Sequence, residues 1–408
     1  RLPPVQAGLP RTVAPQDGAV TFKPLFSRAL GLAPNRLHFA AHSHHLWPDA
    51  SYAAQGLAWD DAMRHADEKW RPIFETVIPR AQGHIARELG LPDPNSLVFS
   101  SNTHDFLIRL FSGIERRPVR ILATDGEFHS FRRQSERWEE AGLAEVVRVP
   151  VEPFDTFADR FVEAARAGRF NWILVSQVFF KTGQAFDRIE DLATLADPAG
   201  PWVVIDGYHG FMATPTDLSG VADRVFYLAG GYKYAMAGEG VCFLHAPPGF
   251  CPRPVTTGWY AEFGNLTGPP DGVQYRIDGG RFWGATFDVS GLYRFNAVQR
   301  LLADQGLSTA AISDHTIGLM RAFQGAIAAG QAGALGQAKL LNPVTDDGPH
   351  ARFLALRHPQ AQAWQQALIG VGVVTDVRAD AIRFGFGLYQ DAADVDQLIQ
   401  KCAAALPL

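Results

Sequence analysis

The sequence predicts an α/β fold, in which a large domain with a mainly parallel sheet between helices precedes a small C-terminal α+β domain. Strand-like and helical patterns alternate over residues 96–245, which is typical of a parallel sheet covered by helices on both faces. After residue 288 the pattern changes to longer helical stretches with two short strands. The length of 408 residues fits two to three domains, and 47% hydrophobic residues are enough for a sizeable core.

We expect three parts along the chain: an N-terminal arm at 1–48, a large domain at 49–290 and a small domain at 291–408. The arm is irregular and should pack with the small domain. Its expected pieces are a short helix near 23–32, an extended piece at 36–39 and a histidine-rich loop at 41–48.

The large domain begins with a helical pattern over 49–89 and ends in a Gly- and Pro-rich loop region at 246–282. The expected strands between them are 96–100, 119–123, 145–151, 172–177, 202–205, 225–228 and 240–245. The expected helices between these strands are 104–114, 130–141, 154–167 and 188–196.

The small domain is expected to contain two strands and four helices. The strands are 351–357 and 381–385, and the first three helices are 292–305, 313–332 and 360–369. The last helix begins at Asp391, because Asp394 three residues later forms a weak capping box with it. Its apolar positions follow helical spacing at Val395, Leu398, Ile399 and Cys402.

Composition excludes several classes of protein. The formal net charge of −5 argues against nucleic-acid binding, which usually needs a basic excess. No apolar run reaches the ~18 residues of a membrane span. Cys242, Cys251 and Cys402 are far apart and indicate neither a disulfide framework nor a metal cluster. With no secretory signal visible, a cytoplasmic location is expected.

Asp206 and Lys233 form the most informative pattern. The apolar run 202–205 ends in Asp206, and the run 224–228 ends in the two glycines and the tyrosine that precede Lys233. A lysine among glycines and aromatic residues can lose its proton and form a Schiff base. A carboxylate at the end of a buried strand can keep a pyridine nitrogen protonated, so the pair predicts a site for pyridoxal 5′-phosphate (PLP). The alternative is a turn-capping aspartate and a surface lysine.

The stretch 203–244 resembles the lysine region of the kynureninase branch of the class V PLP-dependent enzymes. Its matching elements are Asp206 and His209 of an Asp-x-x-His strand end, Pro215-Thr216-Asp217-Leu218, Tyr232-Lys233-Tyr234, and the glycines Gly238 and Gly240. The resemblance implies the fold-type I architecture with a seven-stranded sheet. It also implies a homodimer with active sites at the subunit interface and an amino acid as the small-molecule substrate.

Further motifs resemble the same family and imply cofactor contacts. Asn102 and Thr103 fall at the helix start that binds the phosphate, where free N–H groups favour an anion. Phe128, followed by Ser130, falls where an aromatic side chain stacks on the cofactor ring. The other implied cofactor contacts are His209, Tyr232, Trp259 (toward the partner subunit) and Thr286. Each has a structural alternative: Thr103 as a plain N-cap, and the aromatic residues and His209 as packed core.

On the substrate side, Ile382-Arg383-Phe384 resembles the motif whose arginine grips the substrate α-carboxylate. The alternative for Arg383 is a surface ion pair. The loop at 38–46 departs from the family, because it keeps Ser43 and Leu46 but has histidines at 42, 44 and 45. His42, Ser43 and His44 are therefore expected to border the substrate as acid/base groups or anion contacts. A plain surface loop or a metal site are the alternatives, and no metal is expected.

Other departures also concern the substrate pocket. Residues 285–288 keep only Thr286 of the family's Gly-Thr-Pro-Pro, and 129 and 131 lack its Pro and Asp. His65 falls near a substrate-contacting histidine of the family, in a loosely matching region. The cofactor elements are thus better preserved than the substrate elements.

The resemblance implies kynureninase-type hydrolysis of a Cβ–Cγ bond, which releases alanine and an acid, with Lys233, Asp206 and Tyr232 as catalytic residues. Other class V reactions remain open: transamination, epimerisation, β-elimination or another retro-Claisen cleavage. Cysteine desulfuration is disfavoured, because no cysteine lies between residues 252 and 401. A non-catalytic binding protein on the same scaffold is the alternative from another class.

Overall fold

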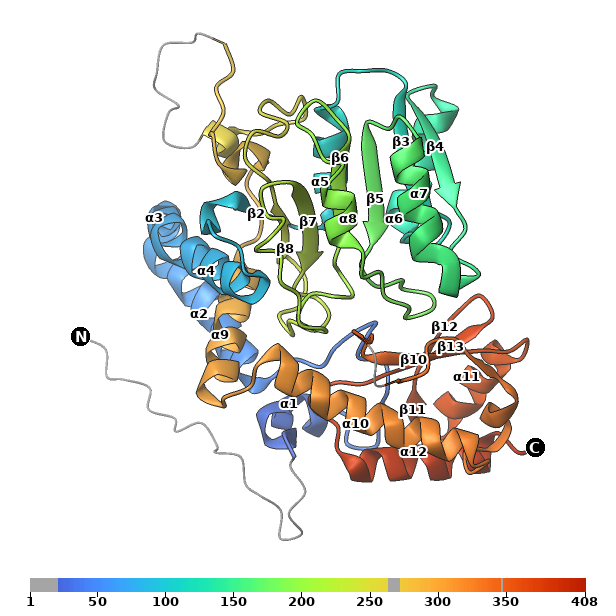
Figure 1. The fold of residues 1–408 in the computed structure, drawn as a ribbon. Coiled ribbons are helices and arrows are strands. Elements are labelled where there is room, and N and C mark those ends of the chain that lie inside the picture. Colours follow the sequence, from blue (N-terminus) through green and yellow to red (C-terminus); the bar gives the residue numbers. More distant parts are fainter. Residues whose placement is uncertain (1–20, 263–271, 346–347) are drawn as a thin grey trace.

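The computed structural model describes residues 21–262, 272–345 and 348–408 (Figure 1). Its centre is a seven-stranded sheet with the strand order β2-β8-β7-β6-β5-β3-β4. In that order the strands are β2 (Leu97–Ser100), β8 (Cys242–His245), β7 (Val225–Gly230), β6 (Trp202–Asp206), β5 (Trp172–Ser176), β3 (Val119–Thr124) and β4 (Ala144–Val149). All neighbours pair in parallel except at β8, which is antiparallel to both β2 and β7. The predicted mainly parallel, seven-stranded α/β fold is confirmed.

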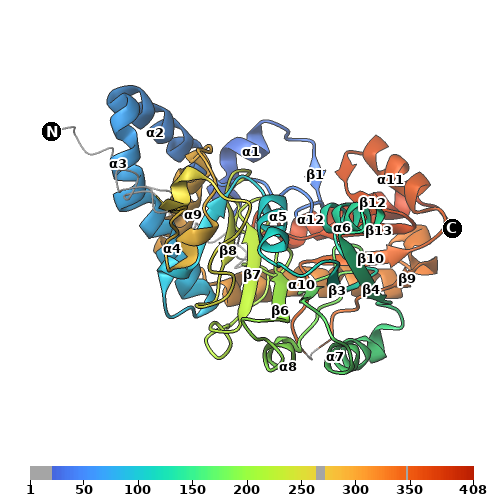
Figure 2. The same ribbon diagram turned by 90° about the horizontal axis from the view of Figure 1, so that it is seen from above.

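Helices cover both faces of this sheet, as Figure 2 shows from above. The helices are α5 (Thr103–Ser112), α6 (His129–Glu140), α7 (Phe157–Ala167) and α8 (Ile189–Ala193). α7 and α8 lie on one face, and α5 and α6 lie on the other (Figure 2). The central strands β5 and β7 are buried at every residue, because both of their faces are covered.

The helical stretch predicted over 49–89 is interrupted. It consists of α2 (Asp49–His65), a 3-10 turn (Ala66–Lys69), α3 (Trp70–Pro72), a π-helical turn (Ile73–Val77) and α4 (Ile78–Leu89). The first break follows from Ala66, whose φ of 48° lies outside the helical region. α2 packs along α9 (Ser290–Asp304), so the start and the end of the large domain lie side by side (Figure 1).

The small domain has a four-stranded antiparallel sheet in the order β12-β13-β10-β9. Its strands are β9 (Lys339–Leu340), β10 (Phe353–Arg357), β12 (Asp376–Arg378) and β13 (Ala381–Gly385), and its helices are α10 (Thr309–Ala328), α11 (Ala361–Gly370) and α12 (Ala392–Ala405). The predicted capping box at Asp391 and Asp394 is present at the start of α12. β9 and β12 were not predicted, since strands of two or three residues show too little alternation.

The N-terminal arm joins the small domain. After α1 (Ser27–Gly31), strand β1 (Leu37–His38) pairs in parallel with β11 (Val373–Val374). Lys23 also bonds Asp391 and Asp394 at the start of α12, at 3.0 Å to each. The histidine loop that follows β1 is therefore anchored between the two domains.

Two further structural findings bear on the sequence predictions. No helix in the described parts of the chain is long and apolar enough to span a membrane. Over the same residues, no group of three or more His, Cys, Asp or Glu side chains is placed to hold a metal ion.

Candidate active site

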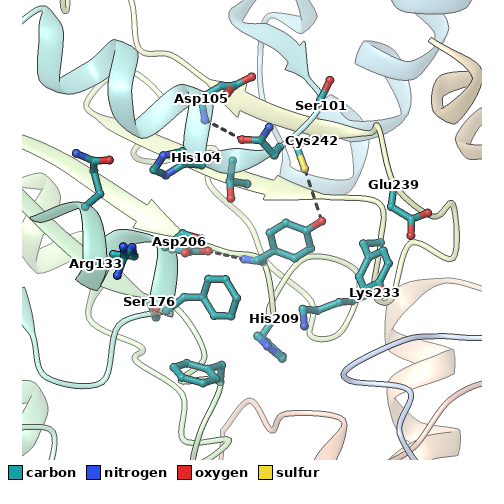
Figure 3. A pocket seen from close by; sticks show the side chains of 18 of the residues that line it. Ser101, His104, Asp105, Arg133, Ser176, Asp206, His209, Lys233, Glu239 and Cys242 are labelled. Atoms are coloured by element: carbon teal, nitrogen blue, oxygen red, sulfur yellow. Dashed lines mark hydrogen bonds between the residues drawn. The ribbon is translucent and has the colours of Figure 1, made fainter. Parts of the chain in front are cut away.

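A cavity of about 970 Å³ lies beside the carboxyl ends of β5, β6 and β7 (Figure 3). Strand ends at this edge of an open α/β sheet are a preferred place for ligands, because loops and helix starts converge there. Nine of the predicted residues line this cavity: Ser43, Asn102, Thr103, Phe128, Ser130, Asp206, His209, Tyr232 and Lys233.

Lys233 extends into the cavity from the loop that follows β7 (Figure 3). Its Nζ donates a hydrogen bond of 2.8 Å to the main-chain oxygen of His42 and lies 5.8 Å from the centre of the Tyr208 ring. Removal of the amine from water, together with the charge of Arg383, lowers the pKa of Lys233 to about 7. A large share of the amine is therefore neutral and nucleophilic near neutral pH.

Asp206 ends β6 and accepts a 3.0 Å hydrogen bond from the backbone N–H of Tyr208. Burial raises the pKa of Asp206 to about 6, while that bond and Lys233 oppose the rise. The carboxylate stays largely ionised at neutral pH and is a better proton acceptor than an exposed aspartate. It can hold a proton on a basic ring nitrogen.

A second buried carboxyl group, Glu127, lies behind Asp206. Its two oxygens are bonded by the hydroxyl groups of Thr124 at 2.7 Å and Ser176 at 2.6 Å. Burial raises the pKa of Glu127 to about 8, and the negative charge of Asp206 adds to the rise. Glu127 therefore keeps its proton at neutral pH, which leaves Asp206 as the charged member of the two.

The start of α5 forms another wall of the cavity. Asn102 caps the helix, because its side-chain oxygen accepts from the N–H of Asp105 at 2.9 Å. The backbone N–H of Thr103 bonds the Cys242 sulfur, and the Tyr208 hydroxyl lies 3.6 Å from the same sulfur. Backbone N–H groups and a phenol thus meet at a helix start, an arrangement suited to a phosphate group.

Gly230 makes room for Tyr208. A Cβ atom at position 230 would lie 2.5 Å from the Tyr208 hydroxyl and 2.7 Å from the Cys242 sulfur, closer than real Cβ atoms come. The glycine at the end of β7 is therefore required by the tyrosine that follows Asp206. Tyr208 and Cys242 were not predicted as site residues, although Tyr208 lies within the Asp-x-x-His motif.

Phe128 and His209 border the same space. Phe128 precedes α6 and is 43% exposed, and its ring packs edge-on against Phe180 at 5.3 Å. His209 is buried, and its Nδ1 has no hydrogen-bond partner within the described structure. A buried polar atom without a partner beside a cavity indicates that a ligand group bonds it.

These features fit PLP on four counts. Lys233 and Asp206 face one space, as an imine lysine and a pyridine-binding carboxylate must. The α5 start and Tyr208 offer donors for a phosphate, and the unpartnered His209 nitrogen faces the same cavity region. The exposed ring of Phe128 offers a surface on which an aromatic ring can stack.

The predicted substrate-side residues are placed less uniformly. Ser43 lines the cavity, and His44 bonds the Tyr232 hydroxyl at 3.1 Å. His42 points away from the cavity and is fully buried against Asp376. Arg383 is also buried behind the cavity wall, whereas Arg378 lines the cavity.

Like His42, His44 and Arg383, three further predicted residues do not line the cavity. His65 is exposed at the end of α2, Trp259 is 43% exposed, and Thr286 is exposed beside Tyr260. Their functional roles remain predictions. The predicted contact of Trp259 is with a partner subunit. Its position outside this chain's own cavity is compatible with that prediction.

Comparison with known proteins adds three findings. Residues 314–402 match the sequence model of the kynureninase C-terminal domain. Isopenicillin N epimerase of Streptomyces clavuligerus is 29% identical over 200 residues, which are 48% of this chain. The match spans half the length of that epimerase.

Solved structures agree over nearly the whole chain. One of these structures is a lysine-to-alanine variant of C-DES with glycine covalently linked to its PLP cofactor. Its match to this chain has a TM-score of 0.76 at 18% identity and covers 93% of this chain and 98% of C-DES. The chain has the fold of the class V PLP-dependent aminotransferase superfamily. The match to the Escherichia coli cysteine desulfurase CsdA has a TM-score of 0.74 at 18% identity. It covers 94% of this chain and 97% of CsdA. The family resemblance predicted from the lysine region is confirmed.

Proposed function

We propose that this protein is a PLP-dependent enzyme that acts on an amino acid and hydrolyses its Cβ–Cγ bond, as kynureninases do. The observation that carries the proposal is the placement of Lys233 and Asp206 around one cavity beside the start of α5. The match of residues 314–402 to the kynureninase C-terminal domain supports the choice of reaction.

The residues that would hold PLP follow from the geometry of the cavity. Lys233 would form the covalent link, Asp206 would bond the ring nitrogen, and Phe128 would stack on the ring. The start of α5, at Asn102 and Thr103, would hold the phosphate, joined by Ser130, Tyr208 and Tyr232. When bound, PLP supplies an electron sink that makes bonds at the α- and β-carbons of an amino acid breakable.

The protein's own groups would move the protons. The Lys233 amine, with a pKa of about 7, would be suited to take the α-proton of the substrate. Tyr232 and His44 are joined by a 3.1 Å hydrogen bond, and Tyr232 lines the cavity. This pair can donate or accept a proton at the substrate side chain, where water attacks the γ-carbonyl carbon.

The test of this proposal is release of alanine. Purified protein loaded with PLP is incubated with L-kynurenine or 3-hydroxykynurenine, and alanine and the aromatic acid are quantified. We expect stoichiometric amounts of both products. Binding of PLP without any alanine from either compound would sink the kynureninase-type assignment and leave the cofactor assignment standing.

Epimerisation is the second candidate, and the 29% identity to isopenicillin N epimerase favours it over the other class V reactions. It needs the same α-proton removal by Lys233 but no attack on the side chain. In deuterated water, an epimerase would exchange the α-hydrogen and invert the α-carbon without releasing alanine. A protein that binds PLP but does neither would fit the non-catalytic alternative.

A homodimer with active sites at the interface forms part of the proposal. One face of α2 exposes three large apolar side chains at helical spacing: Tyr52, Trp59 and Met63 are 66%, 62% and 62% exposed. An exposed apolar helix face of this kind is typical of a covered surface in an assembly. Light scattering should give twice the chain mass of 44.6 kDa, and Trp59→Glu should yield monomers.

A further inference from the structure

The buried network behind the cavity joins three segments of the chain. Asp376 on β12 accepts two hydrogen bonds from Arg383 on β13, from Nε at 2.7 Å and from Nη2. His42 of the N-terminal loop bonds the same carboxylate through Nε2 at 2.7 Å. The ring of His42 stacks on Phe353 at 4.8 Å, and the Arg383 guanidinium lies 5.6 Å from the centre of that ring.

The bonds of Arg383 leave one edge of its guanidinium for a ligand. The Nε–Nη2 edge is occupied by Asp376, and Nη1 also donates to the main-chain oxygen of Phe180. A guanidinium group carries two N–H groups on each terminal nitrogen, so Nη1 and Nη2 each keep one more. These two N–H groups, on the Nη1–Nη2 side of the guanidinium, are the donors left for a carboxylate.

The position of this edge is next to the cavity wall. Phe180 lines the cavity, and its oxygen accepts from Arg383, so the guanidinium lies directly behind that residue. Burial and, after it, the positive charge of Arg383 lower the pKa of Lys233. Arg383 itself does not line the cavity, so an α-carboxylate would meet its guanidinium at the wall formed by Phe180.

The charges in this network suit a single carboxylate. Asp376 pairs with Arg383 and also lies 3.5 Å from Nη1 of Arg378, which lines the cavity. Burial lowers the pKa of His42 to about 4, so at neutral pH the imidazole is uncharged and donates to Asp376. Two arginines and one aspartate leave one positive charge, which matches one substrate carboxylate.

His42 also links this network to Lys233. The His42 ring bonds Asp376, and the main-chain oxygen of His42 accepts a 2.8 Å hydrogen bond from the Lys233 amine. The loop is packed tightly there, because a Cβ atom at Gly385 would lie 2.1 Å from His42 Nδ1. Movement of the loop is therefore transmitted to both Arg383 and Lys233.

We propose that Asp376 and His42 are positioning residues that fix Arg383 so that its free edge receives the α-carboxylate of the substrate. The inference rests on the proposed PLP-dependent function and deepens it. It assigns discrimination between amino acids and simple amines to two residues that do not line the cavity. Without Asp376, the Arg383 guanidinium would lose two of its three hydrogen bonds and keep the one to the main-chain oxygen of Phe180.

The experiment compares two probes that differ only in the carboxylate, L-alanine and ethylamine. Binding of each to the PLP-loaded protein is followed by the change in the visible absorption band of the cofactor. We expect Asp376→Asn to weaken alanine binding by about 10- to 100-fold, because a charged hydrogen-bond partner of Arg383 is lost. His42→Ala should weaken it by about 3- to 10-fold, and ethylamine binding should be unchanged in both variants.

Asp380→Asn serves as the matched control, since Asp380 is an exposed aspartate between β12 and β13 that pairs with Arg357. It should bind both probes as the unmodified protein does. Tighter binding of alanine by Asp376→Asn would mean that Asp376 competes with the substrate for Arg383. An equal loss of affinity for alanine and for ethylamine would mean that Asp376 has a general structural role. Each of these results overturns the proposal.

The failure of this inference can be told from that of the proposed function. An unmodified protein that shows the cofactor band but binds alanine no better than ethylamine overturns the positioning role alone. An unmodified protein without any cofactor band overturns both proposals.

Discussion

The two sides of the cavity are built in opposite ways. On the large-domain side, Asp206 and Lys233 lie at the ends of adjacent strand segments and face the cavity directly. On the small-domain side, His42, Asp376 and Arg383 come from three separate segments and are buried behind the wall. The first side is set by the sheet, whereas the second depends on contacts between distant parts of the chain. Substitutions on the two sides should therefore separate cofactor chemistry from substrate selection.

The largest effect is expected for Lys233→Ala. Loss of the amine removes both the covalent link to PLP and the group that accepts the α-proton, so the visible band and all turnover should disappear. Absorbance before and after borohydride treatment measures this. Lys181→Ala is the control, because that side chain is 39% exposed and does not line the cavity. A borohydride-sensitive band that persists in Lys233→Ala would contradict the assignment.

Asp206→Asn should leave PLP bound but reduce turnover by roughly 10²-fold or more, because an amide cannot hold the ring nitrogen protonated. The measurement is kcat at saturating substrate together with the PLP content of the dialysed protein. If kcat stayed within a few-fold of the unmodified value, Asp206 would have no such role.

The rate at which apoprotein takes up PLP should depend on pH through Lys233. Its pKa is lowered to about 7, so the neutral, reactive amine dominates above pH 7 and is lost as the pH falls below it. We expect the rate of appearance of the visible band to fall about tenfold per pH unit below this midpoint. The negative charge of Asp206 raises the Lys233 pKa, so Asp206→Asn should move the midpoint to lower pH. A midpoint near the ordinary lysine value would contradict the burial effect.

The smallest effect is expected for Tyr208→Phe, which removes one hydroxyl beside the start of α5. Loss of one donor to a phosphate should weaken PLP binding by about 3- to 10-fold, with little change in kcat at saturating PLP. Fluorescence titration of the apoprotein with PLP gives the dissociation constant. Val255→Ala, an exposed residue outside the cavity lining, is the control. Unchanged affinity in Tyr208→Phe would exclude the hydroxyl from the phosphate site.

The sequence predicted most of the large-domain side of the site. Asp206 and Lys233 could be found because Asp206 ends one short apolar run and Lys233 follows the glycines and the tyrosine after the next. Parallel strands bring the carboxyl ends of these runs to one edge. Asn102 could be predicted as well, because its capping bond to Asp105 is local in sequence. Such contacts depend on backbone periodicity and neighbouring residues, which a single sequence displays.

Tertiary structure alone decided the small-domain side. The bond between His42 and Asp376 joins residues 334 positions apart, and nothing local to either marks the other as its partner. The fit of Tyr208 against Gly230 likewise depends on side-chain packing between two strand ends. The sequence thus determined the fold and the lysine and carboxylate that line the cavity through short-range patterns. Only the folded chain determined which buried groups surround Arg383, because burial and long-range pairing set their charge and orientation.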